Sequence, residues 1–152
     1  MTIRVALVDD QELVRIGLAM IVEACDDMTV AAHAADGEQA VAVLSRTRAD
    51  VVLMDIRMPR LDGVETTRRL MSFPEAPRVI ALTTFDLDEY AYAALRAGAS
   101  GFLLKDATAA EVIAAIRTVH SGDAVIAPST TRRMLDHLVH SRDLDANHEA
   151  IG

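Results

Sequence analysis

Val51-Val52-Leu53-Met54-Asp55 sets a carboxylate directly after four apolar residues, and two further runs of this 152-residue chain end in a comparable way. The three runs and the polar residues that follow them are residues 51–54 with Asp55, residues 3–8 with Asp9 and Asp10, and residues 101–104 with Lys105. Such runs are typical of parallel strands that are covered on both faces, and the residues just past the carboxyl ends of such strands meet in one crevice. The sequence therefore predicts a single site that holds three acids and one lysine.

The three acids of this predicted site need a positive partner. Two carboxylates about 4 Å apart repel each other by roughly 4 kcal/mol at an effective dielectric constant of about 20, so a divalent cation would stabilise the cluster. Mg2+ prefers oxygen ligands, uses one or two carboxylates and keeps water or phosphate oxygens in its other positions. We therefore expect Mg2+ at Asp9, Asp10 and Asp55. Zinc is a poorer fit, because the region has no cysteine or histidine and the chain's single cysteine, Cys25, lies elsewhere.

Composition narrows the class of protein. The formal net charge is −8 and there is no basic stripe interleaved with aromatic residues, so we expect that this polypeptide alone does not bind nucleic acid well. A single cysteine excludes an internal disulfide, and the start of the sequence lacks the apolar core of a signal peptide, which favours the cytoplasm. No apolar run approaches the roughly 20 residues that a membrane span requires. These features indicate a soluble cytoplasmic protein.

Hydrophobic periodicity indicates an α/β fold, because short apolar segments alternate with segments of helical spacing. The predicted strands are residues 3–8, 29–34, 51–54, 79–82 and 101–104. The predicted helices are residues 11–24, a segment from Asp36-Gly37 to about Leu44, a short helix that ends near Met71, residues 87–96, and a helix that begins at Thr108. Thr108 and Glu111 have the spacing of a capping box, and Gly98 can supply a left-handed cap. The pattern predicts a doubly wound sheet of five strands with five helices.

The alternating pattern of strand-like and helix-like segments ends at about Gly122. We expect residues 1–122 to form one domain and residues 123–152 to form a linker. Within the linker, residues 131–140 carry apolar side chains along one edge, which predicts a short amphipathic helix, and residues 141–152 are polar and aperiodic, which predicts a loose tail. The chain stops where a second domain could begin.

Five motifs in this order resemble the receiver domain of response regulators in bacterial two-component signalling. They are Val8-Asp9-Asp10, Leu53-Met54-Asp55-Ile56-Arg57-Met58-Pro59, Asp62-Gly63, Leu82-Thr83-Thr84 and Gly98-Ala99-Ser100-Gly101-Phe102-Leu103-Leu104-Lys105. The match covers about residues 3–121 and implies a flavodoxin-like (CheY-like) parallel sheet of five strands in the order 2-1-3-4-5, with five flanking helices. Residues 84–90 and 102–106 resemble the NarL/FixJ (LuxR-like helix-turn-helix) branch, whose members usually join a receiver through a linker helix to a DNA-binding domain.

The resemblance implies a chemical role for each residue of the predicted site. Asp55 would be the phosphoacceptor, Thr83 would donate its hydroxyl to a phosphoryl oxygen, and Lys105 would pair with Asp55 or its phosphoryl group. The implied Mg2+ ligands are Asp9, Asp10, Asp55 and the backbone carbonyl of Arg57. Asp106 stands where many receivers have a proline, so no geometry is predicted for the peptide bond that precedes it.

The resemblance also implies a switch and partners. Thr83 would move toward the phosphoryl group, and Phe102 would turn inward to fill the space that Thr83 leaves. A sensor histidine kinase would supply the phosphoryl group, and two copies of the chain would dimerise through faces near residues 12–23 and 108–121. Changed dimerisation or output-domain contacts would control transcription, with DNA bound only through a C-terminal helix-turn-helix domain that this chain lacks. Such a domain is not an enzyme for an external substrate, because it catalyses only its own phosphorylation and dephosphorylation.

Three other interpretations compete with this one. Asp9 and Asp10 could simply stabilise the start of the first helix, where acids are favourable. The chain could be a pseudo-receiver, an interaction module that keeps the fold without using phosphate. It could also be a phosphotransferase or phosphatase that forms an acyl phosphate at a strand end, although that class usually has a second acid two residues further on, where this chain has Arg57.

Overall fold

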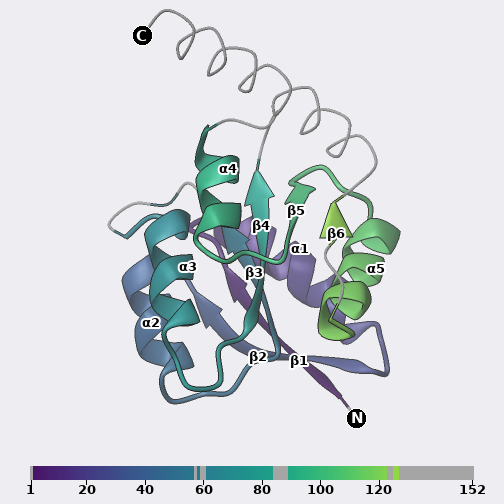
Figure 1. The fold of residues 1–152 in the computed structure, drawn as a ribbon. Helices are drawn as coiled ribbons and strands as arrows, with labels where there is room; N and C mark the ends of the chain where they lie inside the picture. Colours follow the sequence, from purple (N-terminus) through teal and green to yellow (C-terminus); the bar gives the residue numbers. More distant parts are fainter. Residues whose placement is uncertain (1, 57, 59–60, 84–88, 123–124, 127–152) are drawn as a thin grey trace, which may run out of the picture.

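The computed structural model describes residues 2–56, 58, 61–83, 89–122 and 125–126, in which strands and helices alternate along the chain (Figure 1). The strands are β1 (Ile3–Val8), β2 (Met28–Ala34), β3 (Val51–Asp55), β4 (Arg78–Thr83), β5 (Gly101–Leu104) and β6 (Val125–Ile126). The helices are α1 (Glu12–Glu23), α2 (Gly37–Leu44), α3 (Gly63–Met71), α4 (Glu89–Arg96) and α5 (Ala109–His120). The predicted linker helix at residues 131–140 and the predicted tail lie outside the described residues.

The strands form one parallel sheet in the order β2-β1-β3-β4-β5-β6. The five predicted strands and their order 2-1-3-4-5 are confirmed. A sixth strand that was not predicted, β6, adds two residues beside β5. Two residues are too few to produce a periodic pattern in the sequence. α1 and α5 cover one face of the sheet, and α2, α3 and α4 cover the other (Figure 1).

The central strand β3 shows why the sequence adopts this arrangement. All five of its residues are buried. Val52 and Met54 pack with side chains of α2, α3 and α4, whereas Val51 and Leu53 pack with those of α1 and α5. Because successive side chains of a strand point to opposite faces, a strand with helices on both sides requires an uninterrupted apolar run. Burial of β3 on both faces therefore holds Asp55 at the end of a rigid element.

Local signals determine where the helices begin and end. Asp36 and Asp62 are the N-caps of α2 and α3, and each side chain accepts a hydrogen bond from a backbone N–H in the first turn. Thr108 and Glu111 form the predicted capping box of α5, and Gly98 has the predicted left-handed conformation, with φ of 117°. A cap of this kind stabilises a helix by about 1 kcal/mol. None of the helices in the described ranges is long and apolar enough to cross a membrane.

The register of the strands brings their carboxyl ends to one edge of the sheet. Val8 in β1 pairs with Met54 in β3, and Asp55 pairs with Leu82 in β4. Thr83 pairs in turn with Leu104, the last residue of β5. The polar residues at or just after these strand ends are therefore neighbours in space, although up to about a hundred residues separate them along the chain.

Candidate functional site

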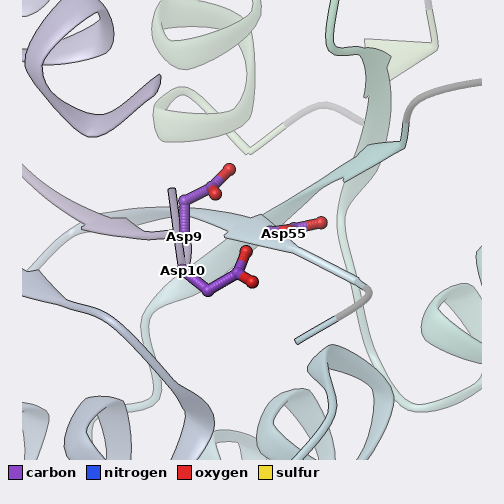
Figure 2. Close-up of side chains that lie close together, drawn as sticks. All are labelled: Asp9, Asp10 and Asp55. Atoms are coloured by element: carbon purple, nitrogen blue, oxygen red, sulfur yellow. The ribbon is translucent and has the colours of Figure 1, made fainter. Parts of the chain in front are cut away.

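Three carboxylates meet at the carboxyl edge of the sheet (Figure 2). Asp55 is the last residue of β3, and Asp9 and Asp10 directly follow β1. One carboxylate oxygen of each residue lies within 4.8 Å of those of the other two. Asp9 and Asp55 are buried, with exposed fractions of 0% and 3%, whereas Asp10 is exposed. The structure thus brings together the three side chains that the sequence proposed as metal ligands.

The ammonium group of Lys105 lies against two of these acids. Its Nζ is 3.1 Å from Oδ2 of Asp55 and 3.3 Å from Oδ2 of Asp9. Burial lowers the pKa of Lys105, but the hydrogen bond to Asp55 and the charges of Asp55 and Asp9 together outweigh burial, so the pKa lies above its ordinary value. Lys105 is therefore protonated at neutral pH and neutralises part of the acidic charge. The peptide bond that joins it to Asp106 is trans.

Asp9 is held so that one of its carboxylate oxygens remains for a cation. Its backbone N–H donates to the carbonyl of Ala34 over 3.1 Å, and its Oδ1 accepts from the N–H of Gln11 over 2.9 Å. Its Oδ2 is buried and accepts no hydrogen bond from the described residues, although the Lys105 ammonium lies 3.3 Å away. A buried acceptor beside two further carboxylates offers the oxygen ligands that Mg2+ prefers. The residues present therefore fit the expected ion.

The interpretation of Asp9 and Asp10 as helix caps is not supported by the geometry. The N-cap of α1 is Gln11, whose side chain makes no capping hydrogen bond. Asp9 accepts from the N–H of Gln11 itself rather than from the first turn of the helix. Asp9 therefore shapes the turn between β1 and α1 instead of closing the end of the helix.

The two predicted switch residues occupy buried positions on adjacent strands. Thr83 is the last residue of β4, with an exposed fraction of 7%, and its carbonyl accepts from the N–H of Lys105 over 2.7 Å. Phe102 in β5 is fully buried in the core between the sheet and α2, α3 and α4. Arg57, whose carbonyl was predicted to bind Mg2+, lies outside the described residues.

Two further residues support the site in ways that were not predicted from the sequence. Arg15 in α1 donates from Nη1 to the backbone carbonyl of Asp9 over 2.6 Å. Gly63 begins α3, and a Cβ at this position would lie 2.5 Å from the carbonyl oxygen of Asp55 and 2.6 Å from Cα of Ile56. Glycine is therefore required for α3 to pack this closely behind Asp55. The glycine after Asp62 was a usable signal for this packing, whereas nothing in the local pattern indicated the contact of Arg15.

Comparisons with known sequences agree on one family. The family model of the response regulator receiver domain matches residues 5–117. The chain is 44% identical over 133 residues to the uncharacterized transcriptional regulatory protein YxjL of Bacillus subtilis, a match that covers 88% of this chain and 61% of that protein. It is 38% identical over 149 residues to the transcriptional regulatory protein LiaR of the same organism, and this match covers 98% of the chain and 71% of LiaR. The chain thus spans less than two thirds of the length of YxjL.

Solved structures give the same result for the fold. A two-component response regulator of the LuxR family from an Aurantimonas species superposes with a TM-score of 0.85 at 32% identity, covering 91% of this chain and 99% of that chain. The receiver domain of the putative response regulator NarL from Mycobacterium tuberculosis superposes with a TM-score of 0.76 at 33% identity, covering 80% of this chain and 98% of that one.

Proposed function

The chain belongs to the response regulator receiver domain family, with relatives of the NarL/LuxR type, and we propose that it accepts a phosphoryl group on Asp55 from a sensor histidine kinase in a reaction that depends on Mg2+. The observation that carries this proposal is the setting of Asp55. It is 3% exposed at a strand end, 3.1 Å from an ammonium group and within 4.8 Å of two further carboxylates. Phosphoryl transfer needs positioned cations more than covalent help from the protein, and this setting meets that need.

In the proposed reaction the Asp55 carboxylate is the nucleophile. One of its oxygens forms a P–O bond as the P–N bond of the donor phosphohistidine breaks, and the electron pair of that bond stays on the imidazole nitrogen. Lys105 keeps its proton and places a positive charge beside the new acyl phosphate, while the fully buried Asp9 keeps the turn after β1 in place. Asp9, Asp10 and Asp55 would hold Mg2+, which would supply further charge neutralisation for the phosphoryl oxygens.

The proposed output follows from the neighbours of Phe102. Thr83 moves toward the phosphoryl group and Phe102 fills the space that Thr83 leaves, which biases two nearly balanced packings of β4 and β5. Phe102 is paired in the sheet with Ala81 on one side and with Ile126 on the other. A shift of Phe102 therefore reaches β6, the strand that precedes residues 127–152 in the sequence. We infer that this route changes dimerisation or output-domain contacts and so controls transcription, with DNA bound through a helix-turn-helix domain.

The first test of this function is intact-mass spectrometry of the wild-type chain after treatment with acetyl phosphate, with Mg2+ and with excess chelator. We expect one phosphoryl adduct that forms with Mg2+ and is lost with chelator. An absence of adduct, under conditions that modify another receiver domain, would contradict the proposal and favour a pseudo-receiver. Turnover of small phosphoesters, with no adduct, would instead favour the phosphatase interpretation.

We propose a dimer interface on α1 and α5, and three exposed apolar side chains support it. Leu13, Ile16 and Met20 are the large hydrophobic residues that the described part of the chain exposes, with exposed fractions of 83%, 48% and 70%, and all three lie on α1. α1 packs beside α5 on the same face of the sheet (Figure 1). An apolar row of this kind on a surface helix is typical of a protein–protein contact surface, and it therefore supports the proposed interface.

Met20→Glu is expected to weaken self-association of the phosphorylated chain at least tenfold. Burial of a methionine side chain stabilises an interface by about 1.5–3 kcal/mol, and each 1.4 kcal/mol corresponds to about a tenfold change in affinity. Sedimentation velocity with and without acetyl phosphate measures the effect. Ala42→Glu, an exposed alanine-to-acid change on α2, is the matched control and should leave association unchanged. Equal association of Met20→Glu and wild type would place the interface elsewhere.

A further inference from the structure

Arg15, in the first turn of α1, contacts the backbone of the acid cluster. Its Nη1 donates to the carbonyl oxygen of Asp9 over 2.6 Å, and the contact is partly buried. Hydrogen bonds from a charged donor are shorter and about twice as strong as those between neutral groups. The Arg15 guanidinium therefore restrains the orientation of this carbonyl, which lies in the turn that carries Asp9 and Asp10.

Restraining the carbonyl of Asp9 also affects the orientation of Asp10. The carbonyl of Asp9 and the N–H of Asp10 belong to one planar peptide unit, so the direction of the carbonyl also sets the direction in which Asp10 leaves the strand. Asp9 has other restraints, since its N–H bonds to Ala34 and its Oδ1 to Gln11. Asp10 is exposed, and within the described residues no hydrogen bond or ion pair reaches its carboxylate. The orientation of the Asp10 carboxylate therefore depends on the backbone conformation more strongly than the orientation of the Asp9 carboxylate does.

We propose that Arg15 is a positioning residue for the Mg2+ site, which holds the Asp9–Asp10 peptide so that the Asp10 carboxylate faces Asp9 and Asp55. The inference rests on the proposed function, because it requires that the three acids bind Mg2+. Partners that orient metal ligands without touching the metal typically change metal affinity by about 10- to 100-fold when they are removed. Arg15 acts here through a backbone carbonyl rather than through a ligand side chain.

The charge of Arg15 makes the inference sharply testable, because two possible effects have opposite signs. A guanidinium near a cation site repels Mg2+, so an arginine that acted only through its charge would weaken binding, and Arg15→Met would then bind Mg2+ more tightly. An arginine that positions Asp10 strengthens binding, and its removal weakens it. The direction of the change in Mg2+ affinity therefore separates positioning from simple electrostatics.

The experiment measures Mg2+ affinity by isothermal titration calorimetry of the unphosphorylated chain. Urea unfolding in metal-free buffer checks that each variant is folded. We expect Arg15→Met to bind Mg2+ about tenfold more weakly than wild type. Arg15→Lys keeps the charge but lacks the planar fork, and should recover only part of the loss. Arg46→Met changes an exposed arginine in the loop between α2 and β3, at the opposite end of the strands, and should bind as wild type does.

A double-mutant cycle with Asp10→Asn tests the proposed route. In the wild-type background, Arg15→Met is expected to lower Mg2+ affinity about tenfold. If Arg15 acts through Asp10, the same change in the Asp10→Asn background should lower Mg2+ affinity by less than twofold. Unchanged or tighter Mg2+ binding by Arg15→Met would overturn the inference, as would a full tenfold loss in the Asp10→Asn background. A wild-type chain that binds no Mg2+ would instead contradict the proposed function itself. If Arg15→Met fails to fold, the titration of Arg15→Lys decides, because wild-type affinity in that variant would also overturn the positioning role.

Discussion

Asp55→Asn is expected to abolish phosphorylation completely under conditions that convert the wild-type chain. The amide of asparagine has nearly the shape of the carboxylate and leaves Asp9, Asp10 and Lys105 unchanged. It is, however, a much poorer nucleophile toward phosphorus than the carboxylate, so the acyl phosphate does not form. The loss of phosphorylation would then reflect the missing nucleophile and not a damaged fold.

The same variant should be slightly more stable than the wild type in metal-free buffer. Asp55 lies within 4.8 Å of two like charges and 3.1 Å from one opposite charge. Removing its charge relieves two repulsions and loses one attraction, and Lys105 keeps its contact with Asp9. We expect the free energy of unfolding to rise by about 1 kcal/mol. This is well below the roughly 4 kcal/mol of a single close repulsion, because the lost attraction to Lys105 largely cancels the relieved repulsions. Mg2+ should stabilise the wild type through mass action and the variant much less.

Intact-mass spectra after acetyl phosphate treatment and urea unfolding curves with and without Mg2+ measure both effects. Asp26→Asn is the matched control, since it makes the same change at an exposed position in the turn between α1 and β2. That control should form the adduct as the wild type does. An adduct of equal yield on Asp55→Asn would show that the acceptor is a different residue.

The part of the site that could be predicted lies on buried strands. Asp55 is the last residue of β3 and Lys105 directly follows β5, and the residues of these strands are all or nearly all buried. The apolar runs, and the carboxylate or ammonium at their ends, were therefore visible in the sequence. The rule that parallel strands gather their carboxyl ends then placed these residues together without any knowledge of the loops. Strong burial on both faces leaves few alternatives for register, and this is why the positions of the acids could be predicted.

The part that could not be predicted depends on the geometry of turns and on short contacts. Arg15 reaches the carbonyl of Asp9 only because the turn through Gln11 directs α1 back across the end of β1. An arginine at a partly exposed helix position has many possible partners. The identity and spacing of Arg15 in the sequence therefore do not predict its hydrogen bond to the carbonyl of Asp9. β6 has two residues and is stabilised by pairing with β5 rather than by its own pattern. In both cases the decisive interaction is tertiary, and local propensity does not encode it.

Lys105→Met is expected to destabilise the metal-free chain by about 2 kcal/mol at neutral pH. Asp9 and Asp55 are buried, and the ammonium lies 3.3 Å and 3.1 Å from their Oδ2 atoms. Removing one partner of a fully buried pair typically costs about 3–5 kcal/mol, because the remaining charge is left without compensation. The side chain of Lys105 is 15% exposed, so water screens part of this cost and we expect a value below that range.

The pH dependence of this cost follows from the direction of the pKa shift of Lys105. Burial lowers its pKa, but the hydrogen bond and charge of Asp55, with the charge of Asp9, raise it further than burial lowers it. A lysine whose pKa is raised by folding contributes its full stabilisation below its unfolded pKa of about 10.4, and loses it as the pH rises through the higher folded value. The stability difference between wild type and Lys105→Met should therefore be constant near neutral pH and should shrink above about pH 10.4.

Urea unfolding of both chains from neutral to alkaline pH, without metal, measures this difference. Arg117→Met is the control, because it removes a cation from the exposed ion pair with Asp27, where screening makes the contribution of the pair small. Saturating Mg2+ should reduce the cost of Lys105→Met, because a divalent cation at the same carboxylates compensates part of the charge that the ammonium had neutralised. A cost of Lys105→Met that is no larger than that of Arg117→Met would mean that Lys105 does not balance the buried acids. Its role would then be limited to the phosphorylated state, in which the acyl phosphate on Asp55 adds the negative charge that an ammonium at 3.1 Å is placed to meet.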